Sequence, residues 1–187
     1  IYTYFISKNF EVNDKNISEE YKKFYNLVRL ENEDEIDKEL VVSAKHESAL
    51  ETLVHEFAHF TQWIEDCPAW KASASTYGNI DEWLGGKDFR YIKKYVALAR
   101  DLELDNEKRS VNVIKTFQLN VNIDEYIRKA NAYVIFYNWM RKTRRWSKPN
   151  NSPYKNQRLK AAMSTKFNMK YKELTPKIER IFKEEDI

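Results

Sequence analysis

The sequence is poor in residues that cross-link a chain or interrupt its helices and strands, with one cysteine, three glycines and four prolines among 187 residues. A single cysteine, Cys67, excludes an intrachain disulfide and a cysteine-based structural zinc site, and it is typical of a protein of the reducing cytosol. So few glycines and prolines, beside 42% hydrophobic and 14% aromatic residues, disfavour a turn-rich sandwich or barrel. We therefore expect a mainly α (α+β) protein.

Long apolar runs are also lacking. No stretch approaches the roughly 20 apolar residues that span a bilayer, and the first residues, "IYTYFISKNF", are not followed by a cleavage pattern. We expect a cytoplasmic protein without a membrane partner. The length is suited to one domain over residues 1–187.

Acidic residues are absent from one long segment. Residues 128–172, named here the basic segment, carry thirteen Lys or Arg and no Asp or Glu, whereas residues 1–127 carry sixteen basic and twenty-four acidic residues. Interleaved aromatic residues, including Trp139, Trp146, Tyr154 and Tyr171, could stack on bases while the cations follow a phosphate backbone. Alternatively, the segment docks against the acidic remainder of the same chain.

Periodicity and capping signals indicate the order of elements. Ser48 followed by Glu51 is a capping-box pattern and predicts a helix start. We expect an irregular connection at residues 66–87, further helix in the basic segment, and a fresh helix start at Pro176. The other expected elements are strands at residues 1–10 and 40–44 ("LVVSA"), a helix around residues 18–28, and long helices at residues 48–65, 89–117 and 124–146.

The stretch "LVHEFAHFTQW" at residues 53–63 contains two of the three histidines. On a helix, His55 and His59 project from one face within reach of a single ion, and Glu56 flanks that face as a base for zinc-bound water. Ordinary helix histidines are the alternative. Apolar neighbours on all sides predict a buried helix, in which imidazoles need strong partners. His46 lacks matching spacing, and we interpret it as a surface or cap residue.

A catalytic zinc needs a third protein ligand, and "DLELDNEKRSV" offers four carboxylates. Helical phase places Glu103 at the centre of the apolar stripe and Glu107 about 40° away, with Asp101 and Asp105 toward solvent. A buried carboxylate needs a partner, so Glu103 is the expected ligand and Glu107 the acceptor that orients a ligating histidine. Exchange of the two roles stays open, as does pairing of both glutamates with residues 108 and 109.

"HEFAH" with the later "ELDNE" resembles the zincin metallopeptidases, specifically the gluzincin pattern. Longer strings, "ELVVSAKHESALETLVHEFAHFTQW", "DLELDNEKRSVNVIK" and "YIRKANAYVIFYNWM", resemble a group of largely uncharacterised phage-encoded metallopeptidase-like proteins over most of residues 37–146. The resemblance implies a zincin-like helical fold with a small edge sheet, "LVVSA" being the strand along which a peptide would lie. It also implies a host-cell cytosolic location. The lack of a Gly-x-x-His third-ligand motif disfavours the metzincin branch.

The expected function is zinc-dependent hydrolysis of peptide bonds in a peptide or protein substrate, with Zn²⁺ on His55, His59 and Glu103 and with Glu56 as the base. Such enzymes also stabilise an oxyanion, for which Tyr133 is the expected residue and Tyr126 and Tyr137 are alternates. The alternative is a non-catalytic protein, with a structural zinc or a cleft plugged by the C-terminal segment. Its basic segment would bind nucleic acid or an acidic protein.

Overall fold

The structure is a computed structural model that describes residues 48–187, and within that range it contains seven helices and no strand. The expectation of a mainly α protein is confirmed. The expected strands at residues 1–10 and 40–44, the helix around residues 18–28, and His46 lie outside the described residues.

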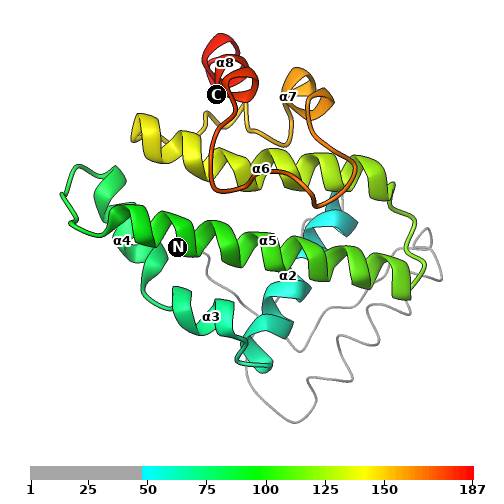
Figure 1. Cartoon of the computed structure of the whole chain (residues 1–187). Helices are drawn as coiled ribbons and strands as arrows, with labels where there is room; N and C mark the ends of the chain where they lie inside the picture. The colour runs from blue at the N-terminus through cyan, green and yellow to red at the C-terminus, as the bar shows by residue number, and fades with distance from the viewer. Residues whose placement is uncertain (1–47) are drawn as a thin grey trace.

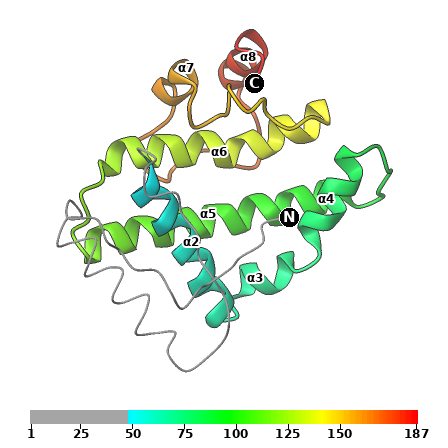
Figure 2. The ribbon, with the colours of Figure 1, turned by 180° about the vertical axis from the view of Figure 1, so that it is seen from behind.

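Two long helices form the centre of the fold. α5 (Ile92–Thr116) and α6 (Ile123–Thr143) lie side by side, and α2 (Ala49–Ile64) packs across α5 with its first turn near α6 (Figures 1 and 2). These bounds agree with the expected helices to within three residues at each end. Among residues 48–187, the Ser48 side chain makes no capping hydrogen bond, and Glu51 binds Lys129 of α6. The expected helix start is therefore right, but the capping box is not formed.

The expected irregular connection at residues 66–87 is wrong, because it folds into α3 (Pro68–Ser73) and α4 (Thr76–Leu84), which both pack on α5. Pro68 occupies the first turn of α3, where its missing N–H is no loss. Gly85 is the C-cap of α4, and Gly86 takes the positive φ of 108° that a non-glycine residue rarely adopts. The same residues that suggested loops act here as helix boundaries.

The C-terminal part covers the face of α6 that points away from α5 (Figure 1). α8 (Pro176–Glu184) begins as expected, with the Thr175 hydroxyl accepting from the Ile178 N–H and Pro176 in the first turn. Between Thr143 and Thr175 the only helix is α7 (Gln157–Ala161), so the expectation of continued helix in the basic segment is largely wrong. Among residues 48–187, none of the helices has the length and apolar character needed to cross a membrane.

Two apolar clusters make up the core, and α5 contributes to both. Val96 and Ala99 belong to a cluster with α6 and α8, whereas Val111 and Ile114 belong to a cluster with α2 and the start of α6. The stretch of α5 between these positions places buried polar side chains inward, namely Glu103, Asn106, Glu107 and Ser110. A polar layer therefore separates the two clusters at the level of the histidines of α2.

Candidate metal centre

The two histidines of "HEFAH" share one face of α2. The rings of His55 and His59 lie edge to face with centroids 4.9 Å apart. The side chain of His59 is buried and that of His55 keeps 22% of its surface exposed. Helical spacing of four residues produces this proximity.

Glu103 of α5 completes a three-residue cluster. Its Oε2 lies 3.5 Å from Nε2 of His59 and 3.8 Å from Nε2 of His55. One possible ligand atom from each residue can be chosen so that all three lie within 4.8 Å of one another. The structure thus brings together the three residues that the sequence predicted as ligands.

Glu107 lies one turn further along α5 and faces the other nitrogen of His55. Its Oε1 is 3.1 Å from Nδ1 of His55. The side-chain nitrogen of Asn106 is also 3.1 Å from Nδ1, but it donates to the His55 carbonyl oxygen at 3.1 Å as well. We assign the Nδ1 proton to the Glu107 contact, because an unprotonated Nδ1 would place a lone pair against the carboxylate.

Gln62 is a partner that sequence reasoning missed. Its Oε1 lies 2.8 Å from Nδ1 of His59, and its Nε2 donates to Asp105 Oδ2 at 2.8 Å. The expectation that Asp105 simply faces solvent was therefore incomplete. Gln62 follows His59 by three residues, which is one helical turn, and this spacing is the signal that could have found it.

Residues 108 and 109 do not neutralise the two buried glutamates. Arg109 pairs with Asp105 at 2.8 Å and with Glu65 at 2.7 Å. Among residues 48–187, no ion pair joins Lys108 or Arg109 to Glu103 or Glu107. The alternative that these cations satisfy the glutamates is wrong for the described residues.

Tyrosine hydroxyls surround the other oxygen of Glu103. Tyr77 of α4 donates to Oε1 at 2.6 Å, and Tyr137 of α6 donates at 3.4 Å. The Tyr133 hydroxyl lies 3.3 Å from that of Tyr137. Tyr126 sits instead beside Glu107, where burial and then the charge of Glu107 raise the pKa of its hydroxyl well above the usual value. Tyr77 was missed because no helix was expected at its position.

The two charged partners shift each other's protonation. Burial alone would lower the pKa of His55, but the charges of Glu107 and Glu103 outweigh it and raise the pKa to about 9. Burial alone would raise the pKa of Glu103, but contact with His59 and His55 and the Tyr77 hydroxyl lower it to about 2. Without a metal, protonated His55 and ionised Glu103 therefore stabilise each other's charge.

The residues present fit a zinc ion. Glu103 Oε2 is buried and, among residues 48–187, accepts no hydrogen bond, although it faces two imidazole nitrogens. A buried carboxylate oxygen without a donor is costly unless a cation lies beside it. Two imidazole nitrogens and one carboxylate oxygen form the three-ligand set of catalytic zinc sites, with a fourth position for water or substrate.

Glu56 differs from Glu51 in the first turn of α2 and from Glu65, the C-cap residue of α2. Glu51 binds Lys129, and Glu65 binds Arg109. The Oε2 atom of Glu56 is buried and has no hydrogen-bond partner among residues 48–187. Glu56 is half-buried, but this one carboxylate oxygen is buried without a donor, and a role in proton transfer would explain it.

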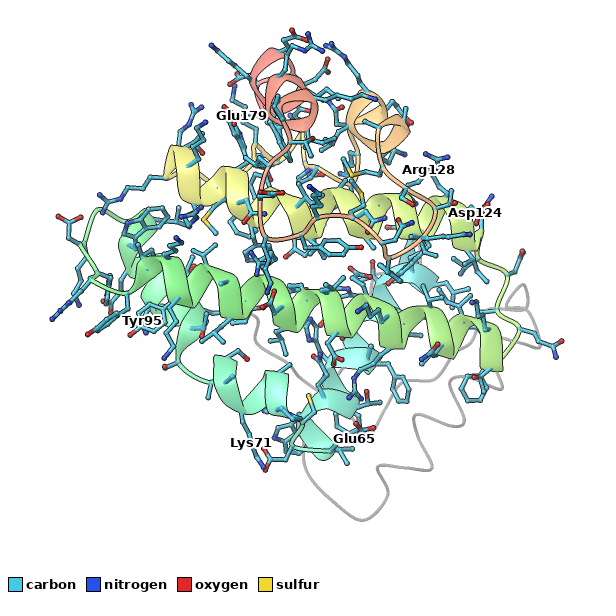
Figure 3. All side chains as sticks on the ribbon, in the orientation of Figure 1. Glu65, Lys71, Tyr95, Asp124, Arg128 and Glu179 are labelled. Atoms are coloured by element: carbon cyan, nitrogen blue, oxygen red, sulfur yellow. The ribbon has the colours of Figure 1, made fainter. Side chains whose placement is uncertain are left out.

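The basic segment is largely paired within the chain. All five acidic residues of 173–187 bind cations of this segment, and Figure 3 labels one of them, Glu179, on α8 near α6. Trp139 and Tyr171, expected to stack on bases, are buried, whereas Trp146 and Tyr154 are exposed. The paired cations and their partners are Lys129 with Glu51, Lys142 with Glu179, Arg144 with Asp88, Lys148 with Asp186, Arg158 with Glu184 and Glu185, Lys160 with Glu125, and Lys170 with Glu173.

Comparison of the chain with protein-family models, with curated proteins and with solved structures gave no match. The functional argument therefore rests on the geometry of the cluster and on the sequence pattern.

Proposed function

We propose that the protein is a zinc-dependent metallopeptidase of the gluzincin type. The observation that carries the proposal is the position of Glu103 Oε2, which is buried, receives no hydrogen bond from residues 48–187, and lies opposite Nε2 of both His55 and His59. His55, His59 and Glu103 would hold the ion. The zincin-like fold with "LVVSA" as its edge strand, along which the peptide would lie, is part of the same proposal.

When bound, zinc would act as a Lewis acid toward a substrate carbonyl and would make a coordinated water acidic at neutral pH. Glu56 would accept the proton of the attacking water and deliver it to the leaving amine. Its unpartnered, buried Oε2 supports this role, because no Lys or Arg of the described chain holds the carboxylate elsewhere.

The polar neighbours of the cluster would hold the ligands in place. Glu107 would accept a hydrogen bond from the Nδ1–H group of His55, leaving Nε2 free to bind the metal. Tyr77 and Tyr137 would hold Oε1 of Glu103, so that Oε2 serves as the ligand atom. Tyr133 is the proposed oxyanion donor, and its contact with the Tyr137 hydroxyl places it two hydrogen bonds from Glu103.

The non-catalytic alternative receives less support. α7 and α8 lie on the far side of α6 from α2 and α5 in both views, so these two helices do not cover the cluster (Figures 1 and 2). Pairing of the acidic C-terminal residues with the basic segment favours an intramolecular role for those charges. Nucleic-acid binding by the remaining cations stays a prediction.

The decisive experiment compares Glu56→Gln with the parent protein, both loaded with zinc. The variant should retain one zinc per chain and lose hydrolysis of a mixed fluorogenic peptide pool by at least ~100-fold, the usual scale for removing a general base. Glu82→Gln, at an exposed site on α4, is the control and should keep the activity. Full activity in zinc-loaded Glu56→Gln would refute the proposed mechanism. A zinc-loaded parent that cleaves no peptide would support the non-catalytic alternative.

A further inference from the structure

The side-chain amide of Gln62 is fully buried and has a partner at each end. Nε2 donates to the Leu102 carbonyl at 3.1 Å and to Asp105 Oδ2 at 2.8 Å, and Oε1 lies 2.8 Å from Nδ1 of His59. Both amide hydrogens are therefore used by acceptors of α5. Rotating the amide by 180° would place its oxygen against a carbonyl and a carboxylate, so only one orientation is compatible with the site.

This orientation fixes the tautomer of His59. Because Oε1 of Gln62 can only accept, the hydrogen of this contact must come from Nδ1 of His59. In the neutral ring the lone pair is then on Nε2, the nitrogen that lies 3.5 Å from Glu103 Oε2. A lone pair and a carboxylate oxygen facing each other attract a cation between them.

Further residues hold Gln62 in this orientation. Asp105 accepts from Arg109 Nε at 2.8 Å as well as from Gln62. Arg109 also donates to Glu65 at 2.7 Å and to Thr61 at 3.3 Å, which ties α5 to the end of α2. These contacts hold the Asp105 carboxylate in place as the acceptor for Gln62.

We propose that Gln62 is a positioning residue that holds His59 with its proton on Nδ1 and its metal-binding lone pair on Nε2. This inference rests on the proposed zinc site, and it gives the two histidines different partners: an uncharged amide for His59 and the carboxylate of Glu107 for His55. Partners of ligating histidines typically change metal affinity by 10–100-fold when removed.

The test combines nitrogen NMR of the His59 ring with zinc affinity measured by chelator competition. In the metal-free parent, at the alkaline end of its stable range, the proton of the neutral His59 ring should reside on Nδ1. Gln62→Met keeps the approximate volume without an acceptor and should lose this preference and about 10–100-fold in zinc affinity. Gln157→Met, at an exposed site on α7, is the matched control.

The outcomes separate this inference from the proposed function. A parent His59 protonated on Nε2, or a folded Gln62→Met with parental zinc affinity, would overturn the role of Gln62 even if the protein is a peptidase. If Gln62→Met does not fold, the tautomer of the parent alone still decides. An Nδ1–H tautomer in a parent that binds zinc but cleaves no peptide would support the role of Gln62 and count against the peptidase.

Discussion

Oε1 of Glu107 lies 3.1 Å from Nδ1 of His55, on the opposite side of the ring from the nitrogen that faces Glu103. One helix, α5, therefore supplies both the proposed ligand and the group that orients a ligand, from positions one turn apart. The two glutamates have the same chemistry, and their distances to the imidazoles assign them different roles.

This assignment can be measured directly. We expect the parent to hold one zinc per chain, Glu103→Gln and His59→Ala to lose it during dialysis, and Glu107→Gln to retain it with affinity reduced about 10–100-fold. Metal content by mass spectrometry and chelator competition give these values. Asp101→Asn, exposed on α5, is the control. If Glu107→Gln loses more zinc than Glu103→Gln, Glu107 is the ligand and Glu103 the residue that orients a histidine.

Stability without metal should depend on pH through His55 and Glu103. The pKa of His55 is raised from 6.5 to about 9, so its contribution is complete below pH 6.5 and is lost as the pH rises through 9. The pKa of Glu103 is lowered from 4.5 to about 2, so its contribution is complete above pH 4.5 and is lost as the pH falls through 2. The metal-free protein should therefore be most stable between these limits, from about pH 4.5 to 6.5.

Urea denaturation in a chelator at several pH values tests this dependence. Between about pH 6.5 and 9 we expect a loss on the order of 2–3 kcal/mol, from about 1.4 kcal/mol per pKa unit. Zinc needs a deprotonated His55, so the stability difference between zinc-loaded and metal-free protein should widen over the same range. A metal-free protein with constant stability from pH 6 to 9 would contradict the proposed charge state of His55.

Tyr77 should contribute to stability through Glu103. Tyr77→Phe removes the hydroxyl that donates to Oε1 at 2.6 Å, and a hydrogen bond to a charged group contributes about 1.5–3 kcal/mol. We expect a loss of this size in urea denaturation of the metal-free protein. Tyr95→Phe, whose ring packs on Phe89, is the matched control. Equal losses in both variants would show that the Tyr77 hydroxyl has no specific role.

The sequence predicted the ligands better than it predicted their surroundings, for a physical reason. His55, His59 and Glu103 are on long helices, where a period of 3.6 residues determines which side chains face inward. Tyr77 is on α4, in a region rich in glycine, serine and turn-forming pairs that favoured an irregular connection. Gln62 is an uncharged residue with no motif, and its role appears only when the backbone and carboxylate acceptors of α5 are in place.

The basic segment provides a last test, because its charges are paired mainly with the C-terminal residues. Replacing Glu179, Glu184, Glu185 and Asp186 by their amides should change stability little, since exposed ion pairs contribute about 0–1 kcal/mol each. It should, however, free three cations, Lys142, Lys148 and Arg158. We expect tighter binding of a single-stranded oligonucleotide and a salt slope steeper by up to about 0.7 per newly contacted phosphate.

A second quadruple variant keeps the same net charge and separates local pairing from total charge. It replaces Asp66, Asp81, Glu82 and Asp124, which are exposed and lie outside the C-terminal residues, by their amides. If both variants bind the oligonucleotide equally, only net charge matters and the C-terminal acidic residues do not mask the basic segment. If only the first variant, at Glu179, Glu184, Glu185 and Asp186, gains affinity, these acidic residues neutralise cations that could otherwise bind a polyanion.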